Sequence, residues 1–273
     1  MTADRHSGVM TVSTSLPPTL AAVLRGDRSR RPLSDRQVAM GLRADLEDRL
    51  FELPRKGSPT SSVLVHTGDV RGSVSGVESL ASTIGRLRGA LIGQLLRLLV
   101  AGHTVDDPFT DALAAWRAAT VASPLMELLN QLDAQDRARL ATDVTAHAVT
   151  LSGRLGTIHP GWRPRTSVAA IQRIGGGFVT LKDRFDLVVG SPNTRQASLV
   201  LLDVTTSPLN PQFERVMRYH ALVQTLLANV APLRVVIFSS ATNELWSAEV
   251  DDELLRRALD ELSEVIAKKL ESP

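Results

Sequence analysis

The sequence predicts an α/β fold of the mixed, α+β-like type, in which a β-sheet flanked by helices follows a helical N-terminal region. Two patterns predict it. Apolar residues recur at three- and four-residue spacing between residues 82 and 155, which is typical of helices that bury one face. After Gly156, short apolar runs alternate with turn residues in the order strand, strand, strand, helix, strand, followed by a last strand and helix. Because 43% of the 273 residues are apolar, the chain can bury a substantial core.

The first 156 residues divide into an arm and a mainly helical region. Residues 1–32 are rich in Ser, Thr, Pro and Arg, which predicts a loosely ordered arm with one short helix at 20–24. Residues 33–156 are expected to pack on the core. A helix should end before Pro54, and a long loop should cover 54–79, where the run Val63–Val65 leaves a hairpin open. Further helices are expected to begin near Ser82, Pro108, Pro124 and Ala134.

Residues 157–273 are expected to form the α/β core. The loop 190–196 is short enough for a hairpin, so the strands on either side of it should be antiparallel neighbours. The expected strands cover 167–174, 178–189, 198–205, 233–239 and 245–250, with helices over 211–229 and from Asp251 onward.

Composition excludes several classes of protein. The absence of cysteine excludes disulfide scaffolds, thiolate zinc sites, iron–sulfur clusters and cysteine nucleophiles. The most apolar stretch, 87–101, contains two arginines and is too short to span a bilayer, and the N-terminus lacks an apolar signal segment. We therefore expect a cytoplasmic protein without a membrane partner. The net charge of +2 does not by itself indicate a nucleic-acid binder.

Two acidic residues stand where strand patterns make them useful. In the strand 178–189, even-numbered positions should share one face, which places Lys182, Arg184 and Asp186 together. Asp203 interrupts the apolar run of the next strand, and a carboxylate there is costly unless it is paired or holds a cation. If the strands are antiparallel neighbours, Asp186 and Asp203 converge within about 8 Å, close enough to share one Mg²⁺ or Mn²⁺ ion.

These residues carry a family resemblance. The runs RFDLVVGSP (184–192), LVLLDVTTSP (199–208) and ERVMRYHALVQTL (214–226) resemble the RecB-like branch of the PD-(D/E)XK nuclease superfamily, whose motifs are a G-R-I-D strand, a strand ending D-x-K-T-G and a helix with a Q-x-x-x-Y motif. The resemblance implies a restriction-endonuclease-like core at 157–273. It also implies that Asp186 and Asp203 are the metal-binding acids and that Tyr219 supports the site.

The sequence also departs from this family pattern. Thr205 replaces the lysine that orients the attacking water, Arg215 replaces the helix glutamine, and the first strand has no acid over 165–169. The family's helix histidine falls on Gly93 or Gln94. Lys182 is the candidate substitute for the missing lysine, although a plain ion pair between Arg184 and Asp186 is the competing interpretation.

A local basic segment points to nucleic acid. Six basic residues and one acid lie between positions 154 and 184, with Trp162 among them, so phosphate contact and base stacking could combine there. A solvated hairpin face is the alternative. The candidate nucleic-acid ligands are Arg154, Trp162, Arg163, Arg165, Arg173 and Arg184.

The function we expect from the sequence is that of a nucleic-acid-associated protein with a PD-(D/E)XK fold and a degenerate or inactive phosphodiesterase site. Two alternatives stay open on this fold: an active Mg²⁺-dependent DNA nuclease, and a structural subunit bound to partner proteins in a larger assembly. A third is a non-nuclease α/β protein with an accidental resemblance. DNA binding should be salt-sensitive, and replacing Arg163 and Arg165 with Ala should reduce that sensitivity.

Overall fold

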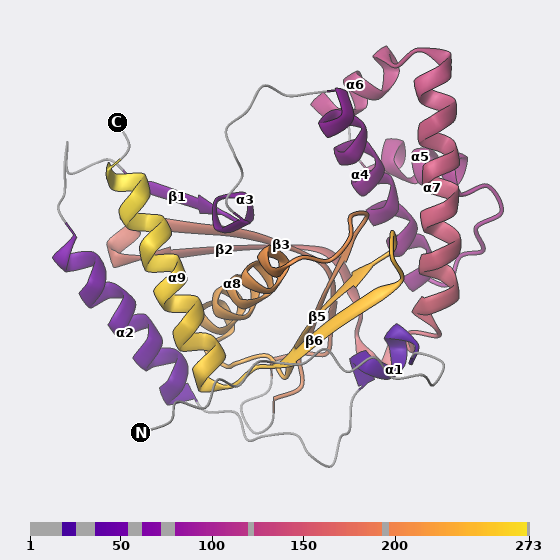
Figure 1. The fold of residues 1–273 in the computed structure, drawn as a ribbon. Coiled ribbons are helices and arrows are strands. Elements are labelled where there is room, and N and C mark those ends of the chain that lie inside the picture. Colours follow the sequence, from indigo (N-terminus) through magenta and orange to yellow (C-terminus); the bar gives the residue numbers. More distant parts are fainter. Residues whose placement is uncertain are drawn as a thin grey trace, which may run out of the picture.

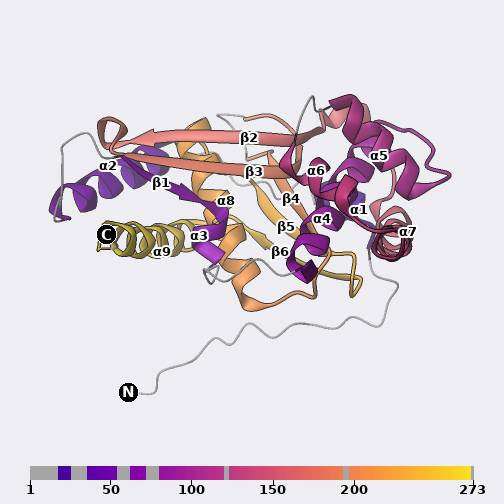
Figure 2. The same ribbon diagram turned by 90° about the horizontal axis from the view of Figure 1, so that it is seen from above.

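A six-stranded mixed sheet runs through the molecule, with helices on both of its faces (Figures 1 and 2). This computed structural model describes residues 18–25, 36–53, 62–71, 80–119, 123–192 and 197–271. The strand order is β1–β3–β4–β5–β6, and β2 pairs with β3. The predicted mixed α/β fold class is confirmed. The strands are β1 (Val63–His66), β2 (Arg165–Ile174), β3 (Val179–Val189), β4 (Val200–Thr205), β5 (Arg234–Ser239) and β6 (Glu244–Glu249).

The second half of the chain has the predicted order of elements. β2, β3 and β4 form an antiparallel meander, in which Leu187 of β3 stands opposite Leu202 of β4. Helix α8 (Pro211–Ala228) then crosses over to β5, which runs parallel to β4, and β6 returns antiparallel to it. Helix α9 (Asp252–Glu271) follows. The expected adjacency of the strands around loop 190–196 is confirmed.

Alternation along β4 and β5 builds two separate cores. Leu201 and Ile237 pack with α8, α9 and α2 (Arg36–Glu52) on one face. Leu202 and Phe238 pack on the opposite face, against a helical group that Figure 1 shows at the far end of the sheet. That group contains α1 (Leu20–Arg25), α4 (Leu80–Val100), α5 (Pro108–Ala119), α6 (Pro124–Gln131) and α7 (Ala134–Leu155). None of the described helices has the length and apolar character that a membrane span requires.

Two expectations for the N-terminal half are wrong. The run 63–65 forms strand β1, which joins the main sheet parallel to β3 and is followed by the short helix α3 (Thr67–Arg71), so it is not a local hairpin. Helix α1 buries Leu20 and Leu24 completely, so this part of the expected arm is packed against the body. The rest of the arm, residues 1–17 and 26–32, lies outside the described residues. A division at residue 156 therefore cuts across one sheet, because β1 pairs with β3.

The sheet forks at the centre of β3. β2 pairs with one edge of β3 from Val179 to Val188, so β1 and β4 must share the other edge. β1 covers residues 179–182 and β4 covers 187–189, which leaves residues 183–186 between them. Because β1 is parallel and β4 antiparallel to β3, the carboxyl ends of both strands meet at this gap.

The side-chain alternation of β3 also changes at the fork. Phe185 and Val188 both belong to the core beneath α8, whereas Leu187 belongs to the opposite core. Ser167, which falls opposite this point on β2, has a left-handed φ of 54°. The expectation that all even positions of the strand share one face is therefore wrong beyond Asp186, because a local irregularity shifts the register of faces there.

Candidate functional site

Four ionisable side chains gather at the fork of the sheet. Asp183 and Asp186 come from the unpaired stretch of β3, Asp203 from the end of β4, and His220 from α8. In open α/β sheets, ligands bind beyond the carboxyl ends of strands where the connections diverge, and this fork is such a point. The position alone makes it the first candidate for a functional site.

A continuous chain of hydrogen bonds links these groups. Thr67 Oγ1 donates to Asp183 Oδ1 over 2.9 Å, and Asp183 Oδ2 lies 2.7 Å from His220 Nδ1. On the other side of the ring, His220 Nε2 lies 2.7 Å from Asp203 Oδ2. A carboxylate faces each ring nitrogen, so the imidazole is held as the doubly donating cation.

The environment of His220 explains its charge. The ring is fully buried, which by itself lowers the pKa, but the carboxylates of Asp183 and Asp203 outweigh burial and raise the pKa well above its ordinary value. Asp183 is 6% exposed and Asp203 has a side chain 20% exposed. The imidazolium therefore connects a buried carboxylate to one that reaches solvent.

Asp186 lies directly beside Asp203. Its backbone N–H donates to Asp203 Oδ1 over 3.3 Å, and its Oδ2 accepts the N–H of Val204 at 2.8 Å. Since the covalent path from that N–H to the Asp186 carboxylate is short, the two carboxylates lie within the expected distance of about 8 Å. Burial first, and the negative charge of Asp203 second, raise the pKa of Asp186 to about 7.

The carboxylate oxygens of Asp186 and Asp203 are already engaged within the protein. Both oxygens of Asp203 already accept hydrogen bonds, and one oxygen of Asp186 is taken by a backbone amide. The imidazolium of His220 supplies the positive charge that a metal would bring, and it repels a second cation. Within the described part of the chain, no group of three or more His, Asp or Glu side chains is arranged to hold a metal ion.

Tyr219 of α8 supports the fork by hydrogen bonding. Its buried hydroxyl lies 3.2 Å from the carbonyl of Val65 in β1 and 3.1 Å from the carbonyl of Lys182 in β3, so one donor ties the two strands together. Burial raises its pKa, so the phenol stays protonated. Tyr219 therefore positions the fork by joining β1 to β3.

The structure does not bring Lys182 to the carboxylates. Its side chain is exposed and its cross-strand partners are His66 and Ile171, both exposed, whereas Asp183 beside it points to α8. Arg184 is also exposed, and it favours the charged form of Asp186 only through a weak electrostatic attraction. Thr205, at the position of the family's lysine, accepts the N–H of Ser207 at 3.1 Å.

The basic segment separates into different environments. Arg154 is only 9% exposed and its guanidinium lies 5.8 Å from the ring of Phe238, so its expected contact with nucleic acid is wrong. Trp162 is partly buried and packs against the core that contains Leu202 and Phe238. Arg163 is exposed, and its Nη1 donates to Ser191 Oγ at 3.3 Å.

The outer face of the β2–β3 pair keeps its cations exposed. Cross-strand pairing places Ile171 beside Lys182, Ala169 beside Arg184, and Arg173 beside Thr180. Arg173, Lys182 and Arg184 are exposed and therefore lie on the face away from α8; in Figure 2 this pair forms the upper edge of the molecule, with α8 and α9 below it. Arg165 is exposed at the start of β2.

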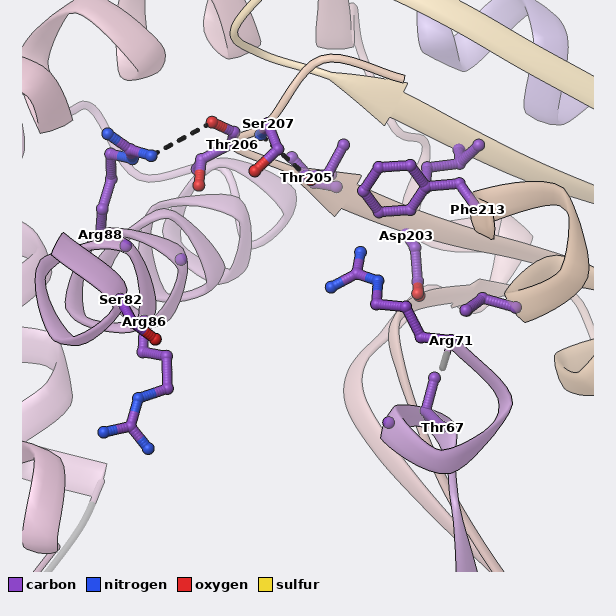
Figure 3. Close-up of a pocket in the computed structure, with 16 residues that line it drawn as sticks. Thr67, Arg71, Ser82, Arg86, Arg88, Asp203, Thr205, Thr206, Ser207 and Phe213 are labelled. Atoms are coloured by element: carbon purple, nitrogen blue, oxygen red, sulfur yellow. Dashed lines mark hydrogen bonds between the residues drawn. The ribbon is translucent and has the colours of Figure 1, made fainter. Parts of the chain in front are cut away.

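A cavity of ≈ 560 Å³ opens at the fork beside Asp203 (Figure 3). Its walls come from α3, from α4, from the segment that ends β4, and from the start of α8. Arg71 reaches in from α3 and Arg86 and Arg88 come from α4 across the opening, with Asp203 next to Arg71. Three arginines and one carboxylate thus line the cavity, although Figure 3 shows the side chain of Arg86 extending away from Arg71 and Asp203.

Sequence reasoning missed the buried half of this site. Asp183 occupies an odd position of the 178–189 strand, and alternation alone assigns it to the core face, where an acid needs a partner. His220 follows Val216 and precedes Val223 at helical spacing, which assigns it to the buried face of α8. Both signals were present in the sequence. Arg71, Arg86 and Arg88 had no such signal.

Comparisons with known proteins add little. No protein-family model matches the chain, and no curated protein matches it. Among solved structures, one described as "Crystal structure of SSO0001" is similar over 83% of this chain and 85% of that chain, with 11% sequence identity and a TM-score of 0.29. A likeness at that TM-score carries no argument about this protein.

Proposed function

We propose that this chain is a nucleic-acid-associated protein built on a nuclease-like fold, with a degenerate site that holds phosphate groups and does not hydrolyse them with a metal ion. One observation carries the proposal: the two carboxylates that should hold a metal are bound inside the protein, by His220 and by backbone amides. A positive charge beside Asp203 is therefore already supplied by the protein.

The fold agrees with this proposal. The antiparallel meander, the crossover helix and the parallel return strand follow the order that the family resemblance implies, and Asp186 and Asp203 meet at adjacent strands. What differs is the cation. Lys182 does not take the place of the missing lysine. The cation that contacts Asp203 is the imidazolium of His220.

The exposed cations support a nucleic acid as the partner. Arg173, Lys182 and Arg184 lie on one sheet face, and cross-strand neighbours are about 5 Å apart while alternate residues along a strand are about 7 Å apart. Asp183, which stands between Lys182 and Arg184 in the sequence, is buried on the opposite face. Among the described residues paired across this face, the ring beside the cations is the imidazole of His66, and none is Phe, Tyr or Trp. We therefore expect contacts with the phosphate backbone and little base preference.

The experiment is a salt titration of binding to fluorescently labelled DNA, single-stranded and duplex, followed by anisotropy. The affinity should fall steeply as salt rises, and the double substitution Arg173→Ala, Arg184→Ala should reduce the slope of log K against log salt by about 2. The matched control is Arg117→Ala, Arg139→Ala, which removes two exposed arginines from α5 and α7, away from this face. The control should keep the wild-type slope.

Cleavage of the same DNA with Mg²⁺ or Mn²⁺ separates the alternatives. We expect intact DNA. Robust cleavage that Asp203→Ala abolishes would contradict the proposal and favour an active nuclease. Absence of binding at low salt would also contradict it and favour a structural subunit that binds partner proteins. A cytoplasmic location remains part of the proposal.

A further inference from the structure

We infer that the cavity at the fork is a binding site for the phosphate group of a nucleotide-sized phosphate ester. The inference rests on the proposed function in one respect, because a nucleic acid is one source of such a phosphate and a free nucleotide is the other. Asp203, one of the two acids of the metal-ion site expected from the sequence, lines this cavity, whereas the cations of the exposed sheet face do not. Its ligand is defined by the residues that line it.

The charge of the lining favours an anion. Arg71, Arg86 and Arg88 line the cavity, against a single carboxylate, Asp203. That carboxylate shares the imidazolium of His220 with Asp183, and Arg88 is paired with Asp143, so the contact with an anion falls first on Arg71. Guanidinium groups are the side chains best suited to phosphate, because their planar N–H donors match two phosphate oxygens at once.

Arg71 is positioned for such a contact. Its guanidinium carbon lies 4.3 Å from the centroid of the Phe213 ring, and this stacking fixes the plane of the group. A stacked guanidinium keeps its N–H donors at the rim, free to point sideways into the cavity. Figure 3 shows Arg71 between Phe213 and the open space that faces α4.

The opposite wall is held in place. Arg88 Nη1 donates to Asp143 Oδ2 at 3.2 Å, and its Nη2 lies 3.4 Å from the carbonyl of Thr206. These contacts join α4 to α7 and to the segment after β4, so the positive charge of Arg88 has a fixed place. Thr206 and Ser207 also line the cavity and bring hydroxyl groups to it.

The helix α4 presents bare backbone to the cavity. Gly85 and Gly89, one helical turn apart, both line it, and a Cβ added at either position would meet nothing within 4 Å. Two glycines in a helix interior each cost about 1 kcal/mol relative to alanine. Here they keep the space beside Arg86 and Arg88 open, and a volume of ≈ 560 Å³ exceeds what a phosphate alone would need.

Calorimetric titration of the full chain with inorganic phosphate, AMP and adenosine tests the site. We expect AMP to bind, phosphate to bind more weakly, and adenosine to show no binding. Arg71→Ala should weaken AMP binding about tenfold or more, and Arg71→Lys should restore part of it, because lysine keeps the charge and loses the planar fork. Equal affinity for AMP and adenosine, or no effect of Arg71→Ala, would overturn the inference.

A steric variant gives an independent check. Gly89→Leu should fill the cavity and abolish AMP binding without removing a charge. Its control is Gly41→Leu in α2, where an added Cβ also meets nothing within 4 Å and the position is remote from Arg71. The melting temperature of each variant shows whether it is folded. A folded Gly89→Leu variant that binds AMP like the wild type would contradict the site.

Competition identifies the source of the phosphate. If the cavity holds a phosphate of a nucleic acid, AMP should lower the affinity for DNA, and Arg71→Ala should weaken DNA binding as well. If AMP and DNA bind independently, the site takes free nucleotides, and the phosphate site stands. Failure of AMP to bind would leave the salt-dependent DNA binding of the exposed sheet face untouched, so the two proposals fail separately.

Discussion

At the scale of single residues, His220 decides the chemistry of the fork. It is the only contact that joins Asp183 to Asp203 among the described hydrogen bonds, and it does so with both ring nitrogens. A buried ion pair often adds little net stability, but removing one partner leaves an uncompensated charge. The removal of His220 should therefore cost much stability, even though the ion pair itself adds little.

We expect His220→Ala to destabilise the protein by about 3–5 kcal/mol, because Asp183 is then buried without a cation. Urea denaturation at neutral pH measures this loss. His103→Ala is the control, since His103 is exposed beyond the end of α4, and it should change stability by less than about 0.5 kcal/mol. A loss below about 1 kcal/mol for His220→Ala would contradict the charged pair.

The pKa of Asp186 gives a prediction for pH. Its pKa is raised from 3.8 to about 7, so between these values the folded protein binds a proton that the unfolded chain does not. The contribution of Asp186 to stability therefore falls as pH rises through this window and levels off above it. Asp186→Asn cannot ionise, so it should gain stability over the wild type between pH 4 and 7, by on the order of 2 kcal/mol.

Urea denaturation across this pH range measures the difference between the two proteins. Asp48→Asn is the control, because Asp48 is exposed on α2, and its curve should run parallel to that of the wild type. A gain for Asp186→Asn that is already complete at pH 4 would show that the effect is not ionisation of this carboxyl.

At the scale of elements, β1 is the strand that the sequence did not predict. The strands of the meander were predictable because each pairs with its neighbour along the chain and carries a long apolar run. β1 has four residues, and its partner β3 lies more than a hundred residues away in the sequence. No local sequence pattern could therefore predict that β1 pairs with β3. With β1 missed, the fork was missed too, and the predicted site held Asp186 and Asp203 without Asp183 and His220.

β1 depends on Tyr219 for its attachment. We expect Tyr219→Phe to cost about 1 kcal/mol, because the hydroxyl shared by the carbonyls of Val65 and Lys182 is lost from a buried place. Amide hydrogen exchange should accelerate in β1 and at the adjoining end of β3. The amides of β5, which make no contact with this hydroxyl, are the internal control. Uniform acceleration through the sheet would indicate a global loss of stability and no local role.

At the scale of the whole molecule, the net charge of +2 conceals a separation of charge. The exposed cations of β2 and β3 lie on one face, the cavity holds three arginines, and the acids of the fork are balanced from within. The sequence could indicate the basic segment but not which of its residues are buried and which are exposed. The burial of Arg154 depends on the packing of α7 against β5. The sequence predicted Asp186 and Asp203 at the candidate site, but not the cation of His220, which joins Asp203 to Asp183.

The measurement that tests the central claim most directly is the affinity for DNA in excess EDTA and in excess Mg²⁺ at equal ionic strength, with the DNA recovered and sized afterwards. The carboxylates of Asp186 and Asp203 already accept hydrogen bonds within the protein, so we predict that binding does not require Mg²⁺ and that the DNA keeps its length. Because Mg²⁺ competes for the phosphates, the affinity in Mg²⁺ should be equal to or lower than that in EDTA. Binding that requires Mg²⁺, or DNA shortened in Mg²⁺ by the wild type and left intact by Asp203→Ala, would contradict it.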